Sequence, residues 1–61
     1  MSTYYLTAFS DKGETLLDTT IDAQNDVEGK RLAQQTLQKE NLDQTTHRLV
    51  TSDATLLLFH R

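Results

Sequence analysis

The stretch NDVEGKRLAQQTLQKEN, residues 25–41, decides the fold, because here the spacing of apolar residues changes from alternating to helical. Asn25 with Glu28 three residues later is a variant of the capping box that begins helices. Asn41 suits the left-handed conformation that ends them. The i, i+3, i+4, i+7, i+8 spacing of one buried helix face is followed by Gly29, Leu32, Ala33, Thr36 and Leu37. The sequence therefore predicts one helix over residues 25–40.

Gly29 is the unusual member of this helix. A glycine inside a helix costs about 1 kcal/mol relative to alanine. The expected reason is a close approach between the helix backbone and a sheet, so we predict that Gly29 and Ala33 lie along the contact line.

Four β-prone segments surround the helix, two before it and two after it: residues 4–9, 15–22, 45–51 and 55–60. Short segments rich in Ser, Asp, Gly and Ala join the members of each pair, as in hairpins. The chain is too short for more than one domain. The sequence therefore predicts a single small α+β domain over residues 1–61. Its elements follow in the order β-β-α-β-β, with one helix packed on a four-stranded, mostly antiparallel sheet.

The strand order depends on which strands are the most apolar. The run Leu56-Leu57-Leu58-Phe59 is apolar on both faces, which is typical of a central strand with both faces covered. Placing the first and fourth strands in the centre gives the order 2-1-4-3. The alternative, 2-1-3-4, makes every neighbouring pair antiparallel.

One helix covers only one face of such a sheet, so several large apolar side chains are expected on the other face. A contiguous exposed apolar patch usually marks an interface, whereas single exposed apolar residues are ordinary. We therefore expect a non-enzymatic interaction module that self-associates or docks a protein partner through the helix-free face. The candidate contact residues are Tyr5, Phe9, Leu56 and Leu58.

A second hypothesis is weak anion or nucleic-acid binding by the basic C-terminal hairpin, through Arg48, His60 and Arg61. Aromatic and arginine side chains together on a sheet are how RNA-binding sheets stack bases. The net charge of −3 argues against a general nucleic-acid binder. The first 28 residues contain one basic and six acidic side chains, which makes that half strongly acidic.

The chain offers little catalytic chemistry. It has no cysteine, and its two glycines do not form a phosphate-binding loop. His47 and His60, on the last two predicted strands, are its only histidines. Two imidazoles with a carboxylate can hold a divalent metal, but the sequence supplies no third ligand and no nucleophile beside them. We therefore expect no enzymatic activity, no metal and no cofactor.

The predicted location is the cytoplasm. No segment approaches the about 20 apolar residues of a membrane-spanning helix. The N-terminal residues Met1-Ser2-Thr3 lead straight into a predicted strand, without a basic segment or a cleavage site.

Four short motifs are spread along the chain: Tyr4-Tyr5-Leu6-Thr7, the Asp11-Lys12-Gly13-Glu14 turn, Thr46-His47-Arg48, and the ending Leu56-Leu57-Leu58-Phe59-His60-Arg61. Together they resemble the small YhzD-like proteins of Bacillus and related bacteria. The resemblance covers nearly the whole chain. It implies a small cytoplasmic bacterial protein and carries over no activity, cofactor or catalytic residue. Its polar part lies on the last predicted hairpin, which is therefore the first place to look for a site.

Overall fold

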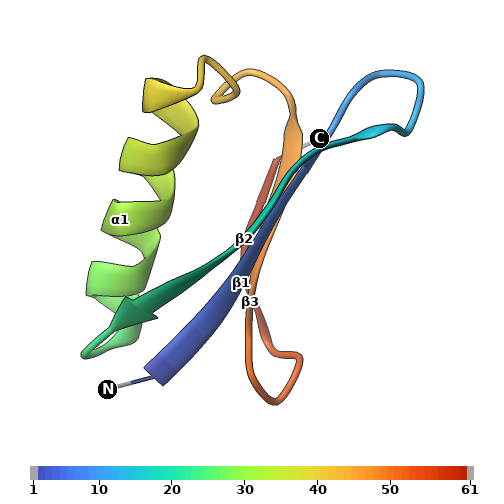
Figure 1. Cartoon of the computed structure of the whole chain (residues 1–61). Coiled ribbons are helices and arrows are strands. Elements are labelled where there is room, and N and C mark those ends of the chain that lie inside the picture. Colours follow the sequence, from blue (N-terminus) through green and yellow to red (C-terminus); the bar gives the residue numbers. More distant parts are fainter. Residues whose placement is uncertain (1, 61) are drawn as a thin grey trace.

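The computed structural model describes residues 2–60 and places one helix on one face of a four-stranded sheet (Figure 1). The helix begins and ends within one residue of the predicted bounds, between the caps Asn25 and Glu40. The α+β class and the β-β-α-β-β order are thereby confirmed. The elements are β1 (Ser2–Phe9), β2 (Thr15–Ala23), α1 (Asp26–Lys39), β3 (Thr46–Thr51) and β4 (Leu56–His60).

The strand order is β2-β1-β3-β4, and every neighbouring pair is antiparallel. The predicted order 2-1-4-3 is therefore wrong, and the alternative 2-1-3-4 is correct. The reason is the direction of the chain after the helix. Phe9 at the end of β1 pairs with Thr46 at the start of β3, so β3 runs back beside β1. With β4 in that place, the pair with β1 would be parallel, which is slightly less stable per residue.

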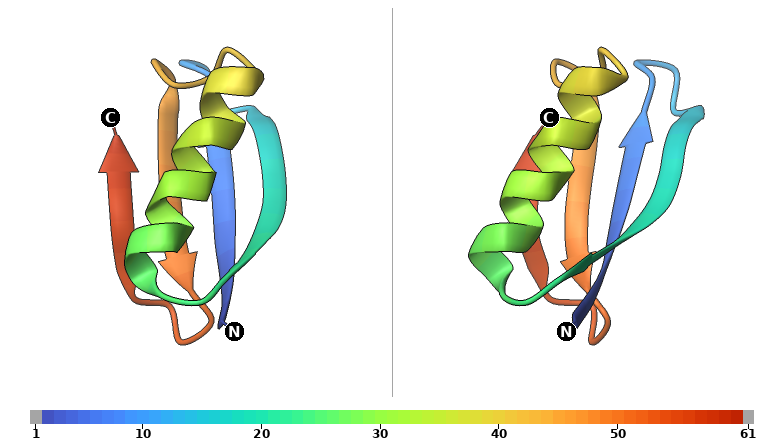
Figure 2. Two further views of the ribbon diagram at one scale, coloured as in Figure 1. Left: turned by 90° about the vertical axis from the view of Figure 1, so that its left-hand side faces the viewer. Right: turned by 60° about the vertical axis from the view of Figure 1, so that its left-hand side comes forward.

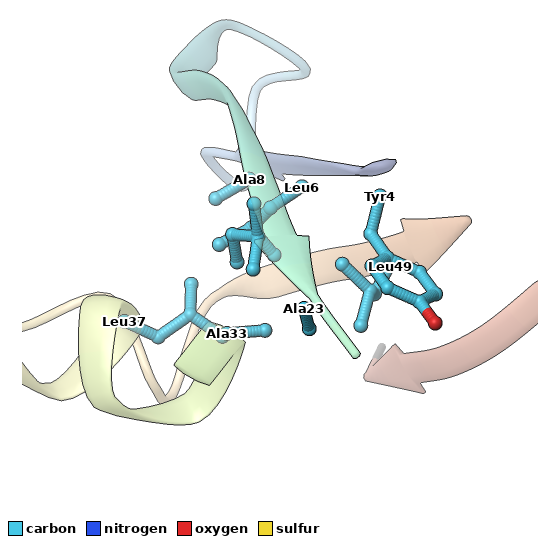
Figure 3. Close-up of a cluster of buried hydrophobic side chains, with 8 residues drawn as sticks. Tyr4, Leu6, Ala8, Ala23, Ala33, Leu37 and Leu49 are labelled. Atoms are coloured by element: carbon cyan, nitrogen blue, oxygen red, sulfur yellow. The ribbon is translucent and has the colours of Figure 1, made fainter. Parts of the chain in front are cut away.

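Alternate residues of β1 form the centre of the core. Tyr4, Leu6 and Ala8 are buried between the sheet and α1. Their cross-strand partners continue the same face, with Tyr4 opposite Ile21 and Leu6 opposite Leu49. Figure 3 shows the side chains of Ala33 and Leu37 from α1 beside this cluster. The predicted apolar stripe of the helix therefore packs on the sheet.

Both ends of α1 are closed by local hydrogen bonds. The side chain of Asn25 accepts a hydrogen bond of 2.8 Å from the Glu28 N–H, and the Glu28 carboxylate accepts one of 3.3 Å from the Gln24 N–H. At the other end Asn41 has φ 59°, in the left-handed region. The Leu42 N–H then donates to the Leu37 carbonyl at 2.7 Å, as in a Schellman motif. These bonds satisfy backbone groups that a bare helix end leaves unpaired.

Among residues 2–60, no helix is long and apolar enough to cross a membrane.

Gly29 lies where the helix backbone meets the ring of Tyr4. A Cβ atom at this position would come within 3.1 Å of Tyr4 Cε2 and within 3.3 Å of two more ring atoms. The ring is itself fixed, because the Tyr4 hydroxyl donates a 2.8 Å hydrogen bond to Asp26 in the first turn of α1. The prediction that Gly29 marks a close helix–sheet contact is confirmed.

Removing the N-cap is expected to weaken the fold. Asn25→Ala deletes the acceptor for the Glu28 N–H, so the free energy of unfolding should fall by about 1 kcal/mol. Asn25→Asp keeps an acceptor at that position and should stay within a few tenths of a kcal/mol of the wild type. Urea denaturation of the three proteins measures this, and equal losses in both variants would contradict the capping role.

Gly29→Ala should also destabilise the protein, although alanine is the better helix former. Overpacking costs about 1–3 kcal/mol, whereas the gain in helix propensity is about 1 kcal/mol. We expect a net loss of about 1 kcal/mol, because the buried ring of Tyr4 has to give way. Tyr4→Phe releases the ring from Asp26, so the loss should be smaller in that background. A Gly29→Ala protein that unfolds at higher urea than the wild type would show that the contact is loose.

Candidate functional site

The helix-free face of the sheet carries a patch of large apolar side chains. In the β1, β3 and β4 register, Tyr5 lies opposite Val50, and Val50 lies opposite Leu56. In the next row Arg48 lies between Thr7 and Phe59. Tyr5, Leu56 and Phe59 have exposed fractions of 43%, 54% and 56%. We call this surface the sheet patch: Tyr5, Phe9, Val50, Leu56 and Phe59.

Arg48 extends the sheet patch rather than interrupting it. Its guanidinium carbon lies 5.6 Å from the centroid of the Phe9 ring, within the range of a cation–π interaction. Such a contact contributes about 0.5–1 kcal/mol at an exposed position. The aliphatic part of an arginine side chain adds apolar area while the charge stays in water. The surface that results is apolar with one positive charge.

The opposite edge of the same face is acidic. Asp18 lies opposite Thr7, and Asp22 lies opposite Thr3, whose hydroxyl donates to it at 3.1 Å. Both carboxylates are exposed on the edge strand β2. Charges on an edge strand discourage pairing with another sheet. The sheet patch is therefore displaced toward β4 and away from β2.

A β-bulge decides which leucines of β4 reach the sheet patch. Leu58 pairs with Leu49 and Leu56 pairs with Val50, so Leu57 has no partner on β3. An extra residue of this kind changes the alternation of side chains along the strand. Leu56 consequently lies on the helix-free face, whereas Leu58 packs against the core.

Three of the four candidate contact residues are therefore on the helix-free face: Tyr5, Phe9 and Leu56. The fourth, Leu58, is on the other face because of the bulge. Sequence reasoning missed Val50 and Phe59, which share rows with Leu56 and Arg48. If side chains alternated without interruption from Leu56 onward, Phe59 would lie on the helix side of the sheet. Only the strand pairing shows the bulge that places it on the helix-free face.

The structure does not bring together the residues of the predicted anion site. Arg48 lies on the helix-free face, opposite Phe59. His60 lies opposite His47, whose neighbour on β1 is the buried Ala8, so His60 is on the helix side of the sheet. Arg61 lies outside the described residues. Because Arg48 and His60 are on opposite faces, they do not form one anion-binding surface.

The two histidines are stacked in a cleft beside α1. Their ring centroids are 5.2 Å apart, with 22° between the ring planes. The cleft has a volume of about 370 Å³ and lies between α1, the loop after it, β3 and β4. Figure 2 shows how α1 slants across the sheet. We call the cleft beside it the histidine cleft. The polar side chains that line this cleft are those of Gln34, Gln38, Asp43, Gln44, His47 and His60.

His47 is the one buried polar residue that residues 2–60 contain, with an exposed fraction of 6%. Its Nδ1 atom lies 2.8 Å from the carbonyl oxygen of Thr45. A carbonyl oxygen only accepts, so Nδ1 carries a proton and donates it to Thr45. In the neutral ring Nε2 is then the atom with the free lone pair.

A second polar cleft of about 380 Å³ lies at the end of the sheet where β1 begins and β3 ends. The hydrogen bond that Tyr4 donates to Asp26 raises the pKa of the Tyr4 hydroxyl, and burial and the Asp26 charge add to this. Hydrogen bonds from the Thr51 and Thr55 side chains hold the pKa of Asp53 below its usual value. Thr51 and Asp53 belong to the β3–β4 turn, where the Thr51 hydroxyl donates to Asp53 and also accepts from the Thr55 N–H. The carboxylates of Asp26 and Asp53 therefore stabilise local structure.

Within residues 2–60, no three His, Cys, Asp or Glu side chains are already arranged around a point that would hold a metal ion. His47 has a backbone carbonyl as its hydrogen-bond partner, not a serine or threonine hydroxyl.

Comparison with known proteins gives a consistent result for the whole chain. The sequence matches the YhzD-like protein family over residues 1–61. It is 36% identical over 61 residues to the uncharacterized protein YhzD of Bacillus subtilis (strain 168), and the match covers 100% of each chain. No solved structure matches the chain. The protein therefore belongs to the YhzD-like family, as its motifs indicated, and this fold is that of a small α+β domain.

The raised pKa of Tyr4 predicts a loss of stability in alkali. The folded state holds this proton more tightly than the unfolded state, whose tyrosine keeps a pKa near 10.0. The contribution is complete below pH 10 and is lost as the pH rises through the folded-state pKa. Above pH 10 the free energy of unfolding of the wild type should therefore fall faster than that of Tyr4→Phe. Parallel urea denaturation curves measured from pH 8 to 11 provide the test, and identical slopes for the two proteins would exclude the effect.

Proposed function

We propose that this protein is a non-enzymatic interaction module that self-associates through the sheet patch. The observation that supports it is the exposure of three large apolar side chains on one face: Tyr5, Leu56 and Phe59. Tyr5 lies on β1, and Leu56 and Phe59 lie on β4. Val50 and Arg48 of β3 fill the rows between them, so these residues form one surface and not scattered single residues. A contiguous patch of this kind is the usual mark of an interface.

A small core makes additional burial valuable. The largest fully buried side chains of the described residues are Tyr4, Leu6, Leu37 and Leu49. A 60-residue domain hides only about 60% of the surface of its unfolded chain, so its stability is marginal. Covering half-exposed residues such as Tyr5, Leu56 and Phe59 contributes about 1 kcal/mol each. Association that covers the sheet patch would therefore stabilise the fold as well as the complex.

The charge pattern favours a second copy of the chain as the occupant. The sheet patch contains no acidic side chain, and Asp18 and Asp22 lie on β2 at the far side of the face. A twofold axis parallel to the strands, displaced toward β4, would place one patch on the other. Such an interface is self-complementary, and both β2 strands stay in water, so the net charge of −3 on each chain opposes contact little.

The area of the face sets the expected strength. The three strands that carry the sheet patch, about 4.8 Å apart and about 20 Å long, present a face on the order of 300 Å². Two such faces bury on the order of 600 Å², which is below the about 1,200 Å² of standard interfaces and is the size of weak, transient contacts. A dissociation constant on the order of 100 µM is therefore expected.

Sedimentation velocity over a concentration series tests the proposal. We expect a monomer at about 10 µM and a dimer at about 1 mM. Leu56→Lys places a charge in the sheet patch and should weaken the dimer at least tenfold. Val27→Lys is the matched control, because Val27 has an exposed fraction of 78% on α1, away from the sheet patch.

Two results would contradict self-association through this face. One is a monomer at every concentration. The other is a dimer that Leu56→Lys and Val27→Lys weaken equally, which would place the contact elsewhere or show that it depends on net charge alone.

A further inference from the structure

We infer that the histidine cleft binds a divalent transition-metal ion of the Zn²⁺ and Ni²⁺ class, with His47 and His60 as the protein ligands. This site lies on the face of the sheet opposite the sheet patch, and it does not depend on self-association. The sequence supplies no third ligand beside the two histidines, so a surface pair is the simple expectation. The structure differs from a surface pair in three respects.

The first is position. His47 and His60 are directly opposite each other on neighbouring antiparallel strands, so both rings project from the same face. The rings are stacked, with 5.2 Å between their centroids and 22° between their planes, so they are neighbours, but their faces and not their nitrogen atoms are turned toward each other. Zinc–nitrogen bonds are about 2.0–2.1 Å long, so both ring nitrogens must approach the same point more closely than they now do. His60 is exposed and can rotate toward the buried His47.

The second is the orientation of His47. Metal-binding histidines almost always donate their other ring N–H to a carbonyl or carboxylate, which fixes the ring and its tautomer. His47 makes this bond, through Nδ1 to the Thr45 carbonyl at 2.8 Å. Among residues 2–60 no buried polar side-chain atom lacks a partner, and the hydrogen bond of this ring is made at Nδ1. Nε2 is therefore accessible from the histidine cleft, and its lone pair is available to a metal ion.

The third is the chemistry of the surrounding cleft. Asp43 lines the same volume and supplies a carboxylate, and the remaining polar groups there are neutral amides, such as those of Gln38 and Gln44. Among residues 2–60, no cationic side chain lines it. Arg48, the nearest positive charge along β3, lies on the other face. Imidazole and carboxylate ligands without thiolate suit zinc and nickel.

Two protein ligands with water in the remaining positions imply moderate affinity. Asp43 would have to move to become a third ligand, because no three-ligand group exists among residues 2–60 as they stand. Binding requires neutral imidazole, so affinity should fall as the solution is acidified. Mg²⁺ and Ca²⁺ prefer oxygen ligands and should not compete.

Calorimetric titration of the metal-free protein with ZnCl₂ and with NiCl₂ is the test, with the imidazole C–H signals followed by NMR. We expect one ion per chain, with shifts at both rings and no response to MgCl₂. His60→Gln should weaken binding at least tenfold without unfolding the protein, because His60 is exposed. His60→Cys should retain zinc binding, since thiolate is a zinc ligand.

Asp43→Asn reports on the carboxylate, and Asp22→Asn is its control with the same change of charge on the other face. We expect a several-fold weakening in the first and none in the second. The inference is overturned if Zn²⁺ does not bind at about 1 mM, or if His60→Gln binds as tightly as the wild type. A stoichiometry of one ion per two chains would show a bridge between copies instead. The titration is repeated with Leu56→Lys, which weakens the proposed dimer. Zinc binding should be unchanged in this variant, because the metal site does not depend on self-association.

Discussion

The contact between the backbone of α1 at Gly29 and the ring of Tyr4 fixes the arrangement of the two layers. A side chain at Gly29 would come within 3.1 Å of the ring, so only glycine allows this approach without displacement. The Tyr4 hydroxyl also bonds to Asp26 in the first turn of the helix. The N-terminal half of α1 is therefore held to β1 by one ring, through both van der Waals contact and a hydrogen bond. The capping bonds at Asn25 fix where the helix begins relative to that ring.

The rest of the surface follows from this placement. A single helix seated on the central strands covers one face, leaves the other face bare, and leaves β4 only half covered (Figures 1 and 2). The bare face holds the sheet patch, and the space beside β4 is the histidine cleft. Along β3, Arg48 belongs to the first surface and His47 to the second, because neighbouring side chains of a strand point to opposite faces. The two surfaces lie on opposite faces of one sheet, but Phe59 of the sheet patch also lines the histidine cleft, so each surface is changed separately only at other residues.

The bulge at Leu57 divides the four apolar residues of β4 between the core, against which Leu57 and Leu58 pack, and the sheet patch. Without it, Leu56 and Leu58 would share a face, as simple alternation predicts. With it, Leu58 contributes to the core, and Leu56 and Phe59 contribute to the sheet patch. An apolar run at the end of the chain therefore does not require a central strand. It belongs to an edge strand that is half covered by α1 on one side and half exposed on the other.

The sequence by itself determined the elements, the helix ends and the glycine at the helix–sheet contact, because capping, periodicity and turn chemistry act between residues close in the chain. It also indicated the YhzD-like family, through short motifs spread along the chain. The tertiary structure decided the strand order, since the direction of β3 after α1 is set by how the layers pack. It also decided the face of Leu58, the separation of Arg48 from His60, and the presence of Asp43 in the cleft that the two histidines line. Each of these depends on pairing or contact between segments distant in sequence, and local physical chemistry does not specify such a register.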